Sequence, residues 1–192
     1  MDQLIKDRIN ESINVKSALL ENHQLLSFVD TFADSAARCI SAGGKLVICG
    51  NGGSASDALH FAGEIVGRFK MERNAWPAVV LNADVATMTA IANDYGYEDV
   101  FARQAQAFIT DKDIFVGIST SGNSENVYRA LQVAKEKGAK TVALLGKDGG
   151  RIAPETDIPI VVPCMETARV QESHIMIIHI VCELVEKALA DE

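Results

Sequence analysis

The chain has 192 residues, of which 48% are hydrophobic, and a formal net charge of −8. This length suits one packed domain, and the negative charge argues against nucleic-acid binding, which depends mainly on clustered Lys and Arg. No apolar run reaches the roughly 18 residues of a membrane span, and the N-terminal sequence MDQLIKDRINES lacks the apolar core of a signal peptide. We therefore expect one cytoplasmic domain over 1–192, with neither a membrane nor nucleic acid as its partner.

The first forty residues have apolar side chains at helical spacing, as at Leu25, Val29 and Phe32. The pattern stops at the sequence AGG over 42–44, because glycine readily ends a helix. Two helices are therefore predicted over about residues 2–41, ahead of the rest of the domain.

Five short β-rich runs follow, and stretches with helical spacing separate them. Such alternation is typical of a parallel sheet covered by helices on both faces. The sequence thus predicts an α/β fold, a three-layer αβα sandwich with a five-stranded parallel sheet, which ends in an amphipathic helix over about 167–190. The predicted strands cover residues 45–50, 78–82, 113–119, 140–146 and 158–163.

The third predicted strand ends in the sequence GISTSGNSENV, which has three hydroxyl residues in a row and a fourth just before a predicted helix. In open α/β sheets ligands bind beyond the carboxyl ends of the strands. Hydroxyls and backbone N–H groups at a helix N-terminus suit a phosphate monoester without any cationic side chain. The alternative is an ordinary capped turn, since Ser, Thr, Asn and Gly are common there too. The run of hydroxyls favours the phosphate site.

The first predicted strand leads into a Gly-rich turn and a helix, ICGNGGSASDALHFAGEIVGR over 48–68. This is a poor dinucleotide fingerprint, because Ala55 stands where GxGxxG requires its third glycine. The glycines instead let the backbone approach a small ligand closely. On the helix, His60 and Glu64 are four residues apart and share one face, which suits a metal ion or a shared substrate proton, although a solvated pair also explains this spacing.

The last predicted helix carries Gln171, Ile175 and His179 at intervals of four, and so on one broad face. Apolar residues surround His179 in the sequence, and a histidine in that setting is more often a core residue than a ligand. Its role therefore depends on whether this face meets the helix that carries His60.

Five sequence blocks, taken in chain order, carry a resemblance to a known family. They read CGNGGSASDALHFAGEIVGRF, IANDYGYEDVFARQ, GISTSGNSENV, LLGKDGG and ARVQESHIMIIH. Together they resemble the sugar isomerase (SIS) family of flavodoxin-like folds and, within it, the phosphoheptose isomerases. Those enzymes interconvert sedoheptulose 7-phosphate and D-glycero-D-manno-heptose 7-phosphate, the first step of ADP-heptose and lipopolysaccharide core heptose biosynthesis. The resemblance covers nearly the whole chain and implies a single SIS domain.

The resemblance also implies roles for individual residues. Glu64 and His179 would be the proton-transfer pair of an aldose–ketose isomerisation through an enediol. One zinc ion per subunit would be held by His60, Glu64, Gln171 and His179, although Gln is an uncommon zinc ligand and a metal-bound Glu is a weaker base. Phosphate would bind Ser119, Thr120, Ser121 and Ser124. The rest of the substrate would contact Asn51, Gly52, Gly53, Glu64, Asn93, Asp94 and Gln171.

The resemblance also implies a homotetramer whose sites are lined by more than one subunit. Residues 1–42 would then serve assembly. One departure is Ala168, where some members have Asp, and it receives no role. The alternative is a catalytically silent SIS protein that binds a protein such as a replication initiator, but that group lacks the Glu and the last-helix His. A sugar-phosphate-sensing regulator would normally carry a DNA-binding domain, for which this length leaves no room.

Overall fold

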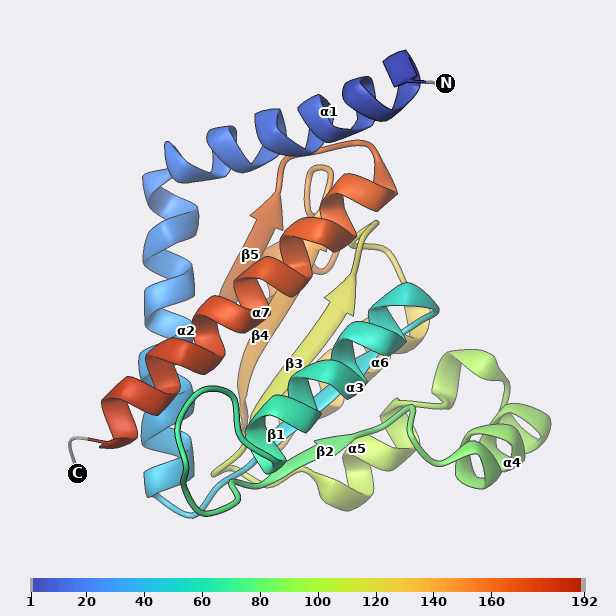
Figure 1. The fold of residues 1–192 in the computed structure, drawn as a ribbon. Helices are drawn as coiled ribbons and strands as arrows, with labels where there is room; N and C mark the ends of the chain where they lie inside the picture. The colour runs from blue at the N-terminus through green and yellow to red at the C-terminus, as the bar shows by residue number, and fades with distance from the viewer. Residues whose placement is uncertain (1, 191–192) are drawn as a thin grey trace.

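Five parallel strands form the centre of the fold, in the order β2-β1-β3-β4-β5 (Figure 1). The computed structural model describes residues 2–190. The strands are β1 (Leu46–Gly50), β2 (Ala78–Val80), β3 (Ile114–Ser119), β4 (Lys140–Gly146) and β5 (Ile158–Val162). The predicted sheet is confirmed. Strand β2 ends before residue 82 because the side chain of Asn82, instead of a strand backbone, accepts the Gly50 N–H at 3.3 Å.

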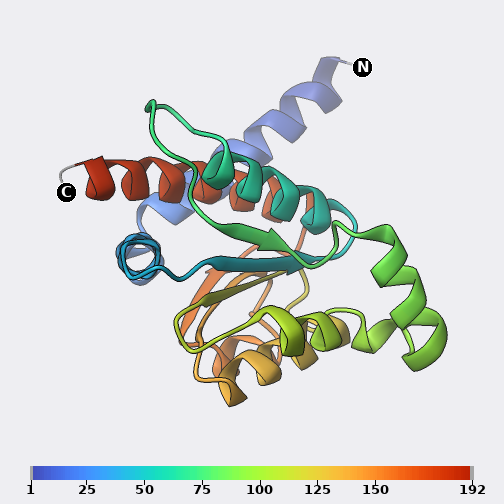
Figure 2. The same ribbon diagram turned by 90° about the horizontal axis from the view of Figure 1, so that it is seen from below.

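Helices cover both faces of the sheet and complete the predicted three-layer sandwich (Figure 2). The central strands β1, β3 and β4 are buried on both faces, so alternate residues point into two separate cores. Leu46 and Ile48 pack in one core with α2, α3 and α7, whereas Val47 and Cys49 pack in the other with α5 and α6. The helices are α1 (Asp2–Leu20), α2 (His23–Ser41), α3 (Gly53–Val66), α4 (Val85–Tyr95), α5 (Ala102–Phe108), α6 (Glu125–Glu136) and α7 (Thr167–Ala190).

The first helix lies outside this sandwich, across the start of α7 (Figure 1). Its only buried residue is Leu19, and the apolar side chains of its first half are more than half exposed. An apolar groove of about 430 Å³ lies between the second half of α1 and the helices α2 and α7. The exposed apolar side chains over residues 4–13 of α1 are Leu4, Ile5, Ile9 and Ile13. Among the helices over 2–190, none has the length and apolar character needed to cross a bilayer.

A buried histidine fixes α7 on the sheet. His174 is 0% exposed, and its Nε2 lies 3.0 Å from the backbone oxygen of Leu145 at the end of β4. An oxygen acceptor requires the proton on Nε2, which leaves Nδ1 unprotonated, and that buried nitrogen has no hydrogen-bond partner within residues 2–190. Burial lowers the pKa of His174 to about 4, although the hydrogen bond to Leu145 acts in the opposite direction.

This imidazole makes stability depend on pH. Because the pKa of His174 is about 4 in the folded chain and about 6.5 when unfolded, the unfolded chain binds the extra proton between these values. The free energy of unfolding should therefore fall by about 2–3 kcal/mol between pH 7 and pH 4.5 from this group alone. Urea titrations at both pH values measure this fall in the free energy of unfolding. In His174→Gln the fall should be smaller by the contribution of this imidazole. An equal fall in both proteins would contradict the assignment.

Candidate functional site

The two unusual loops of the sequence lie side by side at the carboxyl edge of the sheet. Strands β1 and β3 are neighbours, with Gly50 in register with Ile118. Helix α3 follows β1 onto one face of the sheet, and α6 follows β3 onto the other. The chain therefore reverses its winding between these strands, and ligands of open α/β sheets bind at such a point.

The Gly-rich turn after β1 brings the backbone close to α7. Gly52 has a φ of +56°, a conformation that favours glycine, and α3 begins at the next residue. A Cβ added at Gly53 would lie 2.1 Å from Nε2 of Gln171, so a larger residue there would force that amide to move. The turn thus places Gln171 at the N-terminus of α3.

The loop after β3 gathers its hydroxyl groups at the N-terminus of α6. The Oγ atom of Ser119 lies 2.9 Å from Oγ of Ser124 and 3.5 Å from Oγ of Ser121. Ser124 is the N-cap residue of α6, yet its side chain makes no capping hydrogen bond in the helix. Gly122, with a φ of +68°, packs so closely on Gly149 that a Cβ would lie 2.1 Å from the Gly149 oxygen. These hydroxyls are therefore turned toward one another at a positive helix end.

Two arginines near this loop are already paired. Arg129 donates to Glu125 at 2.7 Å and to Asp99 at 2.9 Å, and Arg151 also donates to Glu125. Hydrogen bonds from Arg151 and Arg129 hold the pKa of Glu125 below its usual value. The loop itself thus offers hydroxyls and backbone N–H groups, in line with a phosphate cradle built without a free cation.

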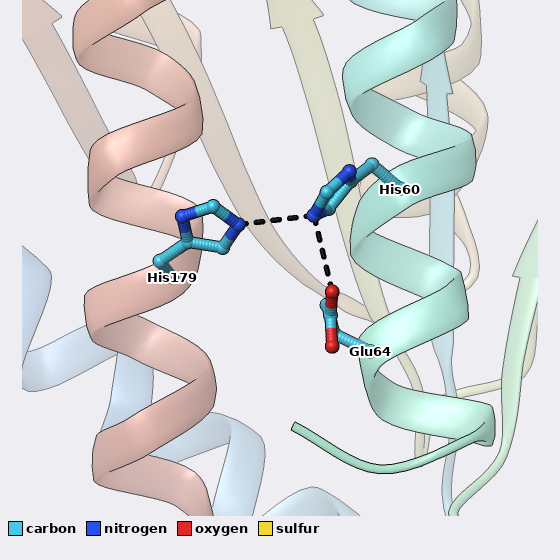
Figure 3. A group of neighbouring side chains, drawn as sticks. All are labelled: His60, Glu64 and His179. Atoms are coloured by element: carbon cyan, nitrogen blue, oxygen red, sulfur yellow. Dashed lines mark hydrogen bonds and ion pairs between the residues drawn. The ribbon is translucent and has the colours of Figure 1, made fainter. Parts of the chain in front are cut away.

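The faces of α3 and α7 meet at three side chains (Figure 3). Nε2 of His60 lies 3.1 Å from Oε1 of Glu64 and 3.0 Å from Nε2 of His179. Residues 60 and 64 share one face of α3, as their spacing predicts, and His179 reaches them from α7. His179 is only partly buried, unlike His174, so it is not a core residue. The condition for a functional His179, that its helix face meets the helix of His60, is thus met.

These three side chains can hold a metal ion. Their nearest ligand atoms all lie within 4.8 Å of one another. Four ligands around zinc at bond lengths of about 2.0–2.2 Å lie about 3.3–3.6 Å apart. The separations of 3.0 and 3.1 Å therefore need little adjustment to admit the ion.

Three other predicted site residues lie apart from this cluster. Gln171 precedes His179 by eight residues, or about 12 Å of helix, and contacts Gly53 instead. Asn93 and Asp94 are exposed on α4, which stands away from the sheet (Figures 1 and 2). Their side chains form a hydrogen bond with each other at 2.9 Å. Their substrate contacts, and zinc ligation by Gln171, stay predictions.

The structure adds two residues that sequence reasoning missed. The side-chain amides of Asn51 and Asn126 exchange hydrogen bonds of 2.8 and 2.9 Å, and the Tyr97 hydroxyl donates to Oδ1 of Asn51 at 3.0 Å. Asn51, from the Gly-rich turn, is thereby tied to the start of α6 beside Ser124. Tyr97 and Asn126 lie within the quoted sequence blocks, but no spacing rule connects them to residue 51.

Comparison with known proteins shows the family to which the chain belongs. The SIS domain family matches residues 11–146, more than half of the chain, so the chain belongs to that family. It is 49% identical to the phosphoheptose isomerase of Geotalea daltonii over 194 residues, which covers 100% of this chain and 99% of that protein. It is 50% identical to the phosphoheptose isomerase of Geobacter sulfurreducens, covering 95% of this chain and 98% of that one. Within the SIS family, the chain therefore belongs to the phosphoheptose isomerases.

Solved structures of two such enzymes have the same fold. The phosphoheptose isomerase of Neisseria gonorrhoeae matches with a TM-score of 0.91 at 39% identity, covering 97% of this chain and 98% of that one. The enzyme of Francisella tularensis matches with a TM-score of 0.92 at 35% identity, covering 96% of this chain and 97% of that one. The N-terminal helices are thus part of the shared fold.

Proposed function

We propose that the protein interconverts sedoheptulose 7-phosphate and D-glycero-D-manno-heptose 7-phosphate, which begins the supply of heptose for lipopolysaccharide core synthesis. One observation carries this proposal: α3 and α7 bring His60, Glu64 and His179 together on one face of a sheet whose carboxyl edge holds a hydroxyl cradle, in a chain about half identical to phosphoheptose isomerases. A catalytically silent SIS protein is disfavoured, because Glu64 and His179 are both present and both adjoin His60.

The reaction moves a proton between C1 and C2 of the sugar. Glu64 is the proposed base at carbon, and His179 exchanges a proton with the substrate oxygens, so that the enediol forms without uncompensated charge. Because both groups adjoin one nitrogen of His60, they can face the same C1–C2 unit. The phosphate, at the other end of the substrate, would bind Ser119, Thr120, Ser121 and Ser124.

We also propose that the cation is zinc. Two imidazole nitrogens and a carboxylate form a typical zinc ligand set, and Gln171 is the proposed fourth ligand. Since its amide now contacts Gly53, that role requires the side chain to turn along α7. When bound, the ion would polarise the substrate carbonyl. Glu64 can serve fully as the base only while it is not a ligand, so its two roles belong to different states of the cycle.

Removing one hydroxyl of the cradle should weaken substrate binding. Ser119→Ala is expected to raise KM about tenfold or more with a smaller change in kcat, because a hydrogen bond to a charged group contributes about 1.5–3 kcal/mol in ground and transition states alike. Steady-state kinetics measure both constants, and Ser27→Ala on the exposed side of α2 is the matched control. A collapse of kcat at constant KM would instead place Ser119 at the reacting end of the sugar.

We propose a homotetramer in which the exposed apolar side chains of α1 are covered by neighbouring subunits. Light scattering should give four times the 20.7 kDa chain mass. Ile9→Glu should reduce this mass, because it places a charge in an apolar interface, whereas Asp7→Lys on the same helix tests whether charge change alone suffices. A monomeric wild-type protein would overturn the proposal.

A further inference from the structure

A segment without helix or strand, residues 67–77, connects α3 to β2 and loops back over α7 (Figures 1 and 2). One buried carboxylate holds it there. Glu186 of α7 is 2% exposed, and its Oε1 accepts from the Phe69 N–H at 2.9 Å and from Nε of Arg73 at 3.0 Å. Its Oε2 accepts from the N–H groups of Lys70 at 2.8 Å and Met71 at 3.0 Å. The segment thus takes its shape from one side chain more than 110 residues away.

This buried group is an ionised carboxylate with a full set of donors. Burial alone would raise the pKa of Glu186, but the hydrogen bonds from the backbone of 69–71 and from Arg73 outweigh it and lower the pKa. A buried charge is costly unless it is fully paired, and an apolar side chain could pack at this position. Packing α7 on the core therefore does not by itself require a carboxylate here.

The anchored segment contacts both residues of the proposed proton-transfer pair. The Phe69 ring stacks on His179, with ring centroids 5.5 Å apart and an interplanar angle of 17°. Arg73 donates from Nη2 to the backbone oxygen of Glu64 at 2.8 Å and from Nη1 to that of Ile65 at 3.0 Å. It thereby caps the last turn of α3, whose carbonyls have no helical partner.

Stacking takes the place of the usual support for a catalytic imidazole. A functional histidine is normally oriented by a hydrogen bond at its second ring nitrogen. Across residues 2–190, the hydrogen bonds found for the His179 ring involve Nε2 alone. The Phe69 face, together with the contact to His60, therefore limits rotation of the ring.

We propose that Glu186 is a positioning residue for the isomerisation: through residues 69–73 it keeps Phe69 stacked on His179 and keeps Arg73 on the backbone of Glu64. This inference rests on the proposed roles of Glu64 and His179. Glu186 does not touch the reacting atoms, and it acts on them only through the segment that it holds.

The test compares two glutamates of α7. Glu186→Gln keeps the size of the side chain but replaces one acceptor oxygen with a donor, so it should release the segment. Glu183→Gln is the control, because Glu183 is partly exposed and, among residues 2–190, pairs with the side chains of Lys70 and Lys187 and accepts no backbone N–H of the segment. Trp76, the only tryptophan in the chain, lies 3.5 Å beneath the Arg73 guanidinium, so its fluorescence reports on the segment directly.

We expect Glu186→Gln to shift the Trp76 emission and to lower kcat about tenfold or more, with KM within about threefold of the wild type. Glu183→Gln should change neither. An unchanged kcat in Glu186→Gln would overturn the proposal, whether or not the Trp76 emission shifts.

Phe69→Leu tests the same step without touching the buried carboxylate, and it decides the matter if Glu186→Gln does not fold. It should lower kcat while the Trp76 emission and the melting temperature stay near wild type. Unchanged kcat would overturn the proposal. If the wild type is active and Glu64→Gln is not, while both positioning variants keep full kcat, only this inference fails. Inactivity of the wild type on the heptose phosphate would instead overturn the proposed function.

Discussion

Glu64→Gln and His179→Asn are each expected to lower kcat by about 100-fold or more while KM changes far less. A positioned acid or base contributes this much to a proton transfer, and its loss affects the transition state more than substrate binding. Both substitutions preserve most of the side-chain volume, so folding should survive. Steady-state rates with sedoheptulose 7-phosphate measure the effect.

Matched controls exist for both variants. Glu72→Gln changes an exposed carboxylate whose partner is Arg68, and His23→Asn changes an exposed imidazole at the start of α2. Both controls should keep wild-type kcat. If Glu64→Gln or His179→Asn keeps it as well, that residue has no part in proton transfer.

His60→Ala is expected to abolish zinc binding and most of the activity together. In the wild-type protein, zinc at about 100 times its Kd should add about 2.7 kcal/mol to the free energy of unfolding, because it binds only the folded state. For a chain of this size the melting temperature should rise by roughly 5–10 °C. Calorimetry with and without zinc measures the rise, which His60→Ala should lack and His23→Ala should retain.

Elemental analysis of the zinc content can contradict the proposed role of the metal. Fully active protein prepared without chelator should carry close to one zinc ion per chain. Fewer than about 0.2 ions per chain at full activity would show that the reaction needs no metal, since a site with several ligands should be stoichiometrically filled. His60 would then serve only to orient Glu64 and His179.

The sequence predicts most of the fold because its signals are local. Parallel strands buried on both faces are continuous apolar runs, as in β1 and β3, and helix spacing places His60 and Glu64 on one face. The helix after the hydroxyl loop is also where the pattern predicts it, with Ser124 as the N-cap residue and Glu125 as its first residue. These features depend only on neighbours along the chain.

Contacts across the fold leave no such local signal. His174 and His179 stand in similar apolar sequence, but five residues turn a helix by about 140° net, so one imidazole meets β4 and the other meets α3. The Glu186 contacts to residues 69–73 join distant segments without any periodicity. Sequence reasoning therefore named the side chains of the proposed proton-transfer pair and missed the contacts that join them to distant segments.

The most direct measurement of the proposed function is an NMR assay of the purified protein with sedoheptulose 7-phosphate, run beside Glu64→Gln under the same conditions. The wild type should convert the ketose until D-glycero-D-manno-heptose 7-phosphate reaches its equilibrium share, and a chelator strong enough to remove zinc should slow that conversion. Glu64→Gln should leave the ketose unchanged over the same time. A wild-type sample in which no aldose resonances appear, with folded and zinc-loaded protein, would contradict the proposed isomerase activity.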